Sequence, residues 1–374
     1  MSTSTPEHPS VSVAGTDSVD VYAQRILDAT LGAIDVFSIY LGDRLGWYRS
    51  LAADGPATAD ELAARTGTHP RYAREWLEQQ AVTGLLSVDD DEPPHFTLSP
   101  AGAEVLTDER SLAYMAPLPR MLTSGAMQMP ALLEAYHTGG GVGWAHYGSD
   151  ARESQSDVNR PWFEQALAGA LQSVPAVDEL LRAPGAAIAD IGCGGGWSTI
   201  ALARAYPNAT LHGFDIDTAS VELARSNVSS EQEVAQRITI TEADVSGLPE
   251  SAFRAVFAFE CIHDMPQPVQ VLAAARRALV PGGAVIVMDE AVGEEFTAPG
   301  DDIERLMYGY SLTVCLPDGM SHQRAWVRAP SCAPPLFGST RRRPLRPDGD
   351  PPDRGFQLLP VLPAVGWVIH FGVR

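Results

Sequence analysis

The feature that most constrains the fold of this chain is a strict alternation of strand-length apolar runs with helical stretches, which begins at Ala186. Such alternation specifies a parallel sheet with helices on both faces, and sheets of this kind bind ligands at the carboxyl ends of their strands. This half of the chain is therefore predicted to be an α/β domain. The apolar runs are AAIADIG, TLHGFDID, ITITEAD, AVFAFECI and AVIVMDEA.

A glycine-rich turn follows the first apolar run and leads directly into a helix. Glycines at this position let the backbone approach a bound nucleotide closely. A dinucleotide-binding fingerprint would need a further glycine three places after Gly194, but Trp197 stands there. The spacing is instead Asp-x-Gly-x-Gly-x-Gly, which disfavours NAD. The residues are Asp190, Ile191, Gly192, Cys193, Gly194, Gly195 and Gly196.

Acidic residues also end the next three strands, in the order Asp215, Asp244 and Glu260. The carboxyl ends of parallel strands share one edge of the sheet, so these carboxylates should lie near the glycine turn. Asp215 is placed to accept both hydroxyls of a ribose. Carboxylates favour a cationic cofactor over a pyrophosphate. The alternative is that Asp190 and Asp215 only cap the helices that follow them.

The glycine turn and the ordered strand-end acids together resemble class I S-adenosylmethionine-dependent methyltransferases. The resemblance implies a Rossmann-like domain and S-adenosylmethionine as cofactor. In that family the acid after the third strand accepts from the adenine amino group, and the adjacent apolar residue packs on the ring. The implied cofactor-binding residues are Asp190, Gly192, Cys193, Gly194, Gly196, Asp215, Ile216, Asp244, Val245, Glu260 and Cys261.

The segment CIHDMPQP after the fourth strand resembles the His-Asp segment of plant- and bacterial-type O-methyltransferases. In those enzymes the histidine deprotonates the acceptor hydroxyl, a task that suits an imidazole near neutral pH. The resemblance implies His263 and Asp264 as catalytic residues. Related enzymes usually continue with Trp and acidic residues, whereas Met265, Pro266 and Gln267 follow here. The departure leaves a capping or packing role for His263 as the alternative.

The N-terminal part predicts a different kind of domain. Apolar residues recur at helical spacing from Val19 to about Trp47, which indicates one long amphipathic helix. A helix, a turn at Gly67, a second helix and two short strands follow, and this order is typical of a winged helix. The arrangement resembles the dimerisation domain of the same O-methyltransferases, so the resemblance covers most of residues 19–323 and implies a homodimer.

We divide the chain into five segments on these grounds: a disordered 1–18, a long helix with a winged helix at 19–107, a helical pocket region at 108–182, the cofactor-binding domain at 183–323 and a tail at 324–374. The pocket region is interrupted by YHTGGGVGWAHYGSDARESQSDVNRPWF, which we interpret either as a surface connection or as a wall over a ligand. Side chains that are candidates for the acceptor pocket, or equally for the core, are Trp144, Tyr147, Asn159, Trp162, Met307, Tyr308 and Tyr310.

The tail departs from the pattern of a class I domain. After about Gln323 the chain is crowded with Pro and Arg, and then becomes apolar without an amphipathic period. The sixth and seventh strands of the sheet are therefore expected to be missing or aberrant. A shift of reading frame would explain the change, since codons exist for which the shifted frame encodes strand-like sequence. A divergent native tail is the alternative.

Charge and cysteine content limit the other functional classes. A formal net charge of -21 disfavours a general nucleic-acid binder. The four cysteines form no CxxC pair, so neither a disulfide framework nor a structural zinc site is indicated. No apolar stretch is long enough for a membrane span and no signal peptide is visible, which predicts a cytoplasmic protein.

Two rival functions remain beside a small-molecule methyltransferase. One is a transcriptional regulator that reads DNA with its winged helix and senses the cofactor. The presumed recognition helix carries Arg71 and Arg74 together with Glu75 and Glu78, a mixed face that is typical of solvent exposure rather than of DNA contact. The other rival is an inactive, truncated methyltransferase. The sequence does not identify the acceptor.

Overall fold

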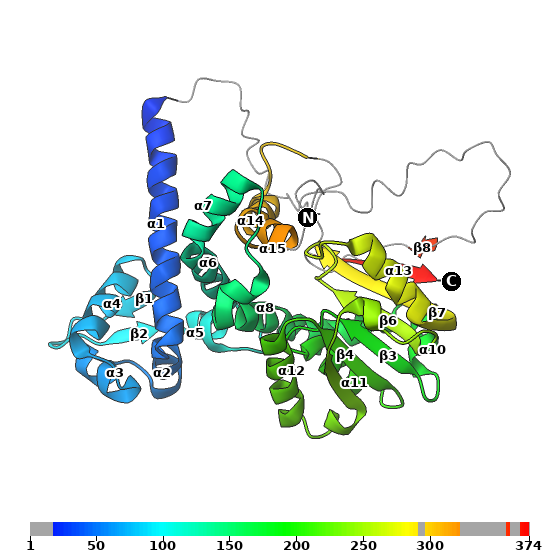
Figure 1. Ribbon diagram of the computed structural model, residues 1–374. Helices are drawn as coiled ribbons and strands as arrows, with labels where there is room; N and C mark the ends of the chain where they lie inside the picture. The colour runs from blue at the N-terminus through cyan, green and yellow to red at the C-terminus, as the bar shows by residue number, and fades with distance from the viewer. Residues whose placement is uncertain (1–17, 291–295, 322–356, 360–366, 374) are drawn as a thin grey trace, which may run out of the picture.

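The computed structural model describes residues 18–290, 296–321, 357–359 and 367–373. A long upright helix and a small helical domain stand at one side, and an α/β domain lies at the other (Figure 1). Between them lies a group of helices drawn from two distant parts of the chain. The segment 1–17 lies outside the described residues, as does most of the tail, so the predicted disorder of the N-terminus stays a prediction.

The α/β domain is built on a seven-stranded sheet in the order β5-β4-β3-β6-β7-β9-β8. Strands β3 to β7 pair in parallel, and β9 and β8 complete the sheet with antiparallel pairings. The strand order reverses between β3 and β6, where ligands bind in such folds. The strands are β3 (Ala187–Ile191), β4 (Thr210–Asp215), β5 (Ile238–Glu242), β6 (Phe253–Phe259), β7 (Leu279–Glu290), β8 (Gln357–Leu359) and β9 (Trp367–Val373).

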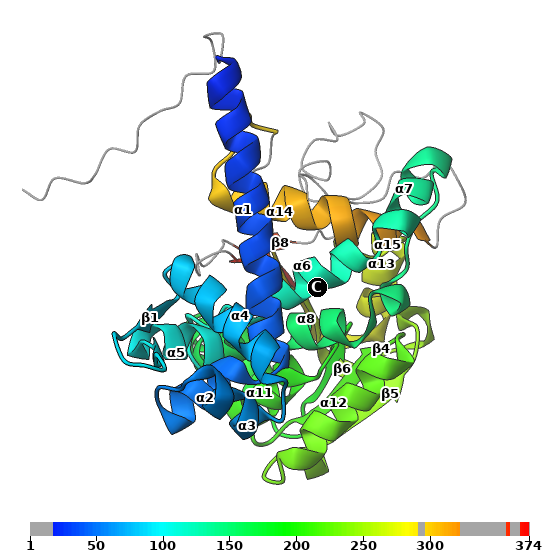
Figure 2. The same ribbon diagram turned by 90° about the vertical axis from the view of Figure 1, so that its left-hand side faces the viewer.

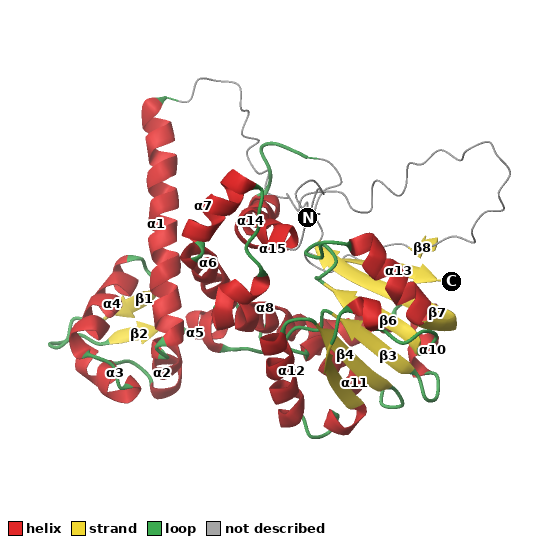
Figure 3. Cartoon of the chain, in the orientation of Figure 1, coloured by secondary structure: helices red, strands yellow, loops and turns green. Residues whose placement is uncertain are grey.

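Helices cover both faces of this sheet (Figure 3). Successive strand residues point to opposite faces, and each face has its own core. In β6, for example, Phe257 joins the core formed with helices α9 to α12, whereas Val256 and Ala258 join the core formed with α13. The covering helices are α9 (Ala168–Gln172), α10 (Pro175–Arg182), α11 (Trp197–Ala205), α12 (Thr218–Ser230) and α13 (Pro268–Ala278).

The expectation that the last two strands are missing is wrong. Trp367–Val373 pairs with Ala284–Glu290 of β7, and Gln357–Leu359 pairs with β9. The apolar run near the C-terminus has strand length and can form a ladder with its backbone, whatever its amphipathic pattern. The Pro- and Arg-rich segment before β8 lies outside the described residues. The frameshift hypothesis is untested and would be settled by sequencing the source gene.

The N-terminal domain has the element order of a winged helix. Trp47, Trp76 and Leu77 belong to its buried core, and the two indole rings lie 4.8 Å apart. Thr58 and Glu61 form a capping box that fixes the start of α3. The elements are α2 (Trp47–Asp54), α3 (Ala59–Thr66), α4 (Pro70–Val82), β1 (Leu86–Val88), β2 (Phe96–Leu98) and α5 (Pro100–Thr107).

The long helix α1 (Val19–Arg44) projects away from the rest of the chain in both views (Figures 1 and 2). Among the described residues, only the C-terminal end of α1 is packed against other elements. There Asp43 forms an ion pair with the buried guanidinium of Arg120 at 3.1 Å, and Arg120 also pairs with Asp157 at 2.9 Å. Arg120 lies on α6 (Pro117–Met127) and Asp157 on α8 (Gly148–Trp162). This buried network joins the N-terminal helix to the central helices.

The central helices differ from the sequence expectation in one respect. The Gly- and aromatic-rich interruption was expected over YHTGGGVGWAHYGSDARESQSDVNRPWF, but much of that segment is helical. Tyr136 belongs to α7 (Met129–Thr138), a short 3-10 turn η1 spans Trp144–Tyr147, and α8 follows at once. Helix α8 shows no apolar period because even its buried residues are largely polar, among them Asp150, Ser154 and Asn159. The chain then continues through a π-helical turn, η2 (Phe163–Leu167), into α9.

The second part of the central group of helices follows β7 in the chain. It consists of α14 (Asp302–Tyr310), a π-helical turn η5 (Ser311–Cys315) and α15 (Leu316–Ser321). Tyr147 donates to the Thr313 carbonyl at 2.8 Å, and the Trp144 amide donates to Asp318 at 2.7 Å. Within the described residues, no helix has both the length and the apolar character needed to cross a membrane.

Candidate active site

The glycine turn lies between β3 and α11, at the point where the strand order reverses. Gly192, Gly194 and Gly196 all have positive φ, a conformation that favours glycine. Gly192 also faces Cys261, because a Cβ on Gly192 would lie 2.8 Å from the Cβ of Cys261. A Cβ on Gly195 would overlap Ser156 of α8. The turn is therefore tight and closely covered by its neighbours.

Helix α8 crosses the carboxyl ends of several strands with one polar face. Arg152 forms an ion pair with Asp217, just after β4, at 2.6 Å. One turn later Ser156 lies against the glycine turn, and Asn159 donates to Glu260, just after β6, at 2.6 Å. Residues at this spacing share one helix face. The helix thus covers the carboxyl edge of the sheet, where the strand-end acids predict the cofactor.

Asp190 ends β3 and is fully buried. Its Oδ2 accepts hydrogen bonds from Ser198 at 2.7 Å and Thr199 at 2.5 Å, both on α11. Its Oδ1 is buried and has no hydrogen-bond partner among the described residues. Burial raises the pKa of Asp190 to about 6. A buried acceptor that lacks a donor is costly, so this oxygen suits a cationic or hydrogen-bonding ligand.

Asp215 ends β4, and its carboxylate accepts from the backbone amides of Gly194 and Asp217, each at 2.9 Å. Burial raises its pKa, and these amide hydrogen bonds oppose the rise. The next residue, Ile216, is 61% exposed. An exposed apolar side chain beside a carboxylate fits an adenosine, whose ribose is polar and whose base is flat and apolar.

Asp244 and Val245 follow β5 closely. Asp244 caps the 3-10 turn η4 (Val245–Gly247), and its carboxylate accepts from the Ser246 amide at 2.7 Å. The hydrogen bonds from Ser246 lower the pKa of Asp244. Val245 is buried in the core on the α13 side of the sheet. The structure therefore gives both residues a local structural role in addition to the expected contact with adenine.

The two cysteines in the predicted cofactor set are both well covered. Cys193 is buried in the turn itself, and the Cys261 thiol donates to the Ile191 carbonyl at 3.3 Å. Burial raises the pKa of each thiol. Both are therefore neutral packing residues of the turn rather than nucleophiles.

Glu260 follows β6 in a strained conformation, with φ at 49°. Its Oε2 accepts from Asn159 and, at 3.2 Å, from Gln155. Its Oε1 is buried without a hydrogen-bond partner among the described residues, and burial raises the pKa of Glu260 to about 8. Together with Asp190, Glu260 offers a second unsatisfied acceptor on the two strands that flank the switch point.

His263 lies in the segment after β6 and is 9% exposed. Its Nδ1 is hydrogen-bonded to Asp289 Oδ1 at 2.5 Å, and its Nε2 lies 3.2 Å from Asp264 Oδ1. Burial by itself would lower the pKa of His263, but Asp264 and Asp289 raise it well above the ordinary value. The two carboxylates therefore favour the doubly protonated, cationic form of the ring. Asp264 is placed to stabilise a proton on Nε2.

Comparisons with known proteins bear directly on this site. Residues 188–283 match the family model described as a methyltransferase domain, and residues 33–108 match an Rv2258c-like winged HTH domain. The chain is a class I S-adenosylmethionine-dependent methyltransferase with an N-terminal winged-helix domain. This agrees with the resemblance seen in the glycine turn and strand-end acids.

Curated relatives of the methyltransferase include O-methyltransferases. It is 26% identical to the 3-amino-4-hydroxybenzoate 4-O-methyltransferase of Streptomyces cremeus over 279 residues, which are 72% of this chain and 74% of that enzyme. It is 36% identical to a ubiquinone biosynthesis O-methyltransferase of Alkalilimnicola ehrlichii over 103 residues, which are 27% of this chain and 40% of that enzyme.

Solved structures share the fold of the methyltransferase over nearly its whole length. An O-methyltransferase family protein from Burkholderia thailandensis matches with a TM-score of 0.67 and 17% identity, covering 96% of this chain and 99% of that one. Human N-acetylserotonin methyltransferase, solved in complex with SAM, matches with a TM-score of 0.62 and 19% identity, covering 96% of this chain and 99% of that one.

The residues of the methyltransferase fit its cofactor. S-adenosylmethionine carries an ammonium, and the unsatisfied oxygens of Asp190 and Glu260 are acceptors for such a group. It also carries an adenosine, and Asp215 with the exposed Ile216 offers the matching polar and apolar surfaces. No arginine is needed to neutralise a phosphate. This set of acidic acceptors beside an apolar side chain thus suits a cationic nucleoside.

The predicted pocket residues of the methyltransferase have mixed placements. Asn159 is 7% exposed and binds Glu260, whereas Tyr147 is buried in the central helices. Trp162 packs against the core of the α/β domain. Tyr310 carries a buried hydroxyl that has no hydrogen-bond partner among the described residues. Of the remaining three, Trp144 and Tyr308 make ring contacts with Tyr147 and Phe296, and Met307 is half-buried.

Sequence reasoning gave no role to Asp289, Arg152 or Gln155, which complete the site. Asp289 lies near the end of β7, and the rule that picked the acids at the other strand ends would have found it. Arg152 and Gln155 lie on α8, whose largely polar sequence has no apolar pattern from which its orientation could be predicted. The structure alone brings them to the sheet.

Proposed function

We propose that the methyltransferase transfers the methyl group of S-adenosylmethionine to an oxygen of a small-molecule acceptor, with His263 as the base. The observation that carries this proposal is the hydrogen bond between His263 and Asp289 at the carboxyl edge of the sheet. Bound S-adenosylmethionine supplies an electrophilic methyl group. Because methyl transfer requires an in-line arrangement, the pocket contributes mainly by positioning the acceptor.

The proton path follows from the tautomer of His263. Asp289 holds a proton on Nδ1, which directs Nε2 toward the acceptor side. The proton that Asp264 stabilises on Nε2 first leaves to solvent, and the neutral Nε2 then takes the proton of the acceptor hydroxyl. His263 is thus the catalytic base, Asp264 the carboxylate that stabilises its protonated form and Asp289 its positioning residue. We keep the cofactor-binding residues that the sequence implies, from Asp190 to Cys261, as the proposed binding site for S-adenosylmethionine.

The name of the relative from Streptomyces cremeus favours a phenolic acceptor. We test oxygen against nitrogen with two matched probes, 3-amino-4-hydroxybenzoate and 3,4-diaminobenzoate, and S-adenosylmethionine labelled in its methyl group. Methylation of the hydroxyl in the first probe, with little transfer to the second, is expected. Transfer to amino groups at equal rates in both probes would contradict oxygen as the acceptor atom.

The methyltransferase is further proposed to act as a homodimer through α1. In the part of the chain that the structure describes, this helix buries only Gly42 and Asp43, and apolar side chains at helical spacing are exposed along its length. A helix this long with an uncovered apolar face needs a partner. The exposed side chains are Val19, Val21, Tyr22, Ile26, Leu27, Leu31, Ile34, Phe37 and Leu41.

Light scattering coupled to size-exclusion chromatography measures the state of assembly. A dimer is expected for the native chain, and the pair Leu31→Glu and Ile34→Glu should give a monomer because both charges fall on the exposed face of α1. Glu substitutions at Asp28 and Asp35, which are already acidic, serve as the matched control. A native monomer would contradict the proposal.

A further inference from the structure

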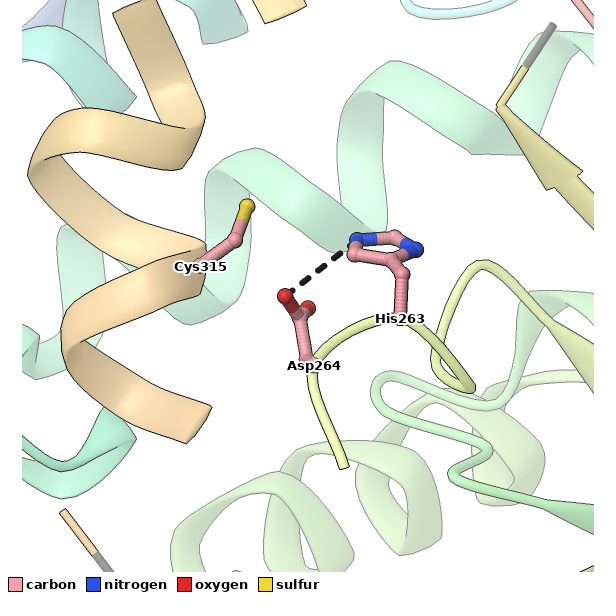
Figure 4. Close-up of side chains that lie close together, drawn as sticks. All are labelled: His263, Asp264 and Cys315. Carbon is pink, nitrogen blue, oxygen red and sulfur yellow. Dashed lines mark ion pairs between the residues drawn. The ribbon is translucent and has the colours of Figure 1, made fainter. Parts of the chain in front are cut away.

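Three potential metal ligands converge beside the proposed base. His263 Nε2, Asp264 Oδ1 and Cys315 Sγ lie within 4.8 Å of one another, and the close-up shows the cysteine facing the other two from a separate helix (Figure 4). His263 and Cys315 are 9% and 7% exposed. Asp264 Oδ1 is buried and accepts no hydrogen bond from the described residues beyond its ion pair with Nε2.

This combination of donors selects among metal ions. An imidazole, a carboxylate and a thiolate suit Zn²⁺, whose sites with three protein ligands keep a fourth position open. Mg²⁺ and Ca²⁺ prefer sites built from oxygen alone. The thiol of Cys315 therefore favours a thiophilic cation over Mg²⁺ or Ca²⁺.

The surroundings of the three ligands support a cation as well. Metal-bound histidines usually donate their other ring N–H to a carboxylate, and Asp289 already accepts from His263 Nδ1. Glu290 Oε1 lies 3.8 Å from Nε2 and adds a further acidic group. The histidine is thus fixed in the tautomer that leaves Nε2 for a metal.

We propose that His263, Asp264 and Cys315 form a binding site for a thiophilic divalent cation such as Zn²⁺, and that its occupation inhibits methyl transfer. Binding releases the protons of the Cys315 thiol and of Nε2 to solvent. Inhibition follows because the metal takes the nitrogen that serves as base. The inhibitory part rests on the proposed function, whereas the binding site itself does not.

Titration of the full chain with Co²⁺, used as a coloured probe for Zn²⁺, tests the site. A thiolate-to-cobalt charge-transfer band is expected, with Cys315→Ser abolishing it and Asp289→Asn weakening cobalt binding about 10- to 100-fold. The exposed group of Asp89, Asp91 and His95 on the wing is a second place where Co²⁺ could bind. It contains no thiol, so His95→Ala should leave the band unchanged.

Activity assays with Zn²⁺ separate the two parts of the proposal. Zn²⁺ should inhibit the native enzyme but not Cys315→Ser, whose uninhibited rate and melting temperature should match the native values. Absence of the band, or its survival in Cys315→Ser, would overturn the site. Co²⁺ and Zn²⁺ binding through Cys315 without inhibition would leave the site standing and overturn both the inhibition and the role of His263 as base.

Discussion

His263 and Asp289 are joined by a hydrogen bond of 2.5 Å between Nδ1 and Oδ1, although they come from different strand ends. The bond crosses from the segment after β6 to the end of β7, which are neighbours in the sheet. Sheet pairing therefore sets the orientation of the imidazole. The geometry of the proposed base depends on the same β6–β7 register that holds the core together.

Asp289→Asn should lower kcat about 100-fold with little change in KM, because an amide cannot hold the required proton on Nδ1 as a carboxylate does. Steady-state kinetics measure the effect. Glu290→Gln serves as the control, since it removes an adjacent charge but leaves the hydrogen bond to Nδ1 in place. Equal losses in the two variants would show that Asp289 acts only through its charge.

Asp215→Ala should weaken S-adenosylhomocysteine binding by about 1 to 3 kcal/mol, the cost of losing charge-assisted hydrogen bonds. Isothermal titration calorimetry measures the affinity directly. Glu222→Gln on α12, an exposed acid near Asp215 in the chain, is the charge-matched control and should bind normally. Unchanged affinity in Asp215→Ala would remove this residue from the cofactor site.

The affinity for S-adenosylhomocysteine should rise with pH because of Glu260. Burial raises the pKa of its carboxyl from 4.5 to about 8, so the group is largely neutral at neutral pH. A ligand ammonium favours the ionised form, and affinity should therefore increase from about pH 6.5 to pH 8 and then level off. Calorimetry across this range should show the rise in the native chain and not in Glu260→Gln.

Removal of residues 357–374 should destabilise the protein, because β9 covers the backbone edge of β7. Each lost ladder hydrogen bond costs about 1 kcal/mol and each kcal/mol lowers the melting temperature by about 2 to 4 °C, so a drop of about 10 °C or more is expected. Differential scanning fluorimetry measures it. An unchanged melting temperature would show that the pairing of β9 with β7 contributes little.

Much of the α/β domain could be predicted because its strands are buried on both faces and its ligand edge is fixed by topology. Asp190, Asp215 and Glu260 could be assigned to one edge from their positions at strand ends alone. The last strands could not be predicted. Their backbone completes the sheet, but the preceding Pro-rich composition suggested that the regular pattern had ended.

Residues that reach the site from other parts of the chain were harder to foresee. Asn159 was a candidate because of its region, but its partner Glu260 is far away in sequence, and only the packing of α8 brings them together. Cys315 gave no signal, since no motif or spacing links it to His263. Side chains on polar helix faces and on distant turns are placed by tertiary packing, which local patterns do not encode.

Methyl transfer by the native chain and by His263→Ala, each with labelled S-adenosylmethionine and a panel of phenols, tests the central claim most directly. The account predicts that the variant loses about 100-fold or more in turnover while S-adenosylhomocysteine affinity stays nearly intact. Calorimetry on the same samples provides that second value. Equal turnover by the two proteins, with cofactor bound equally well, would contradict His263 as the base.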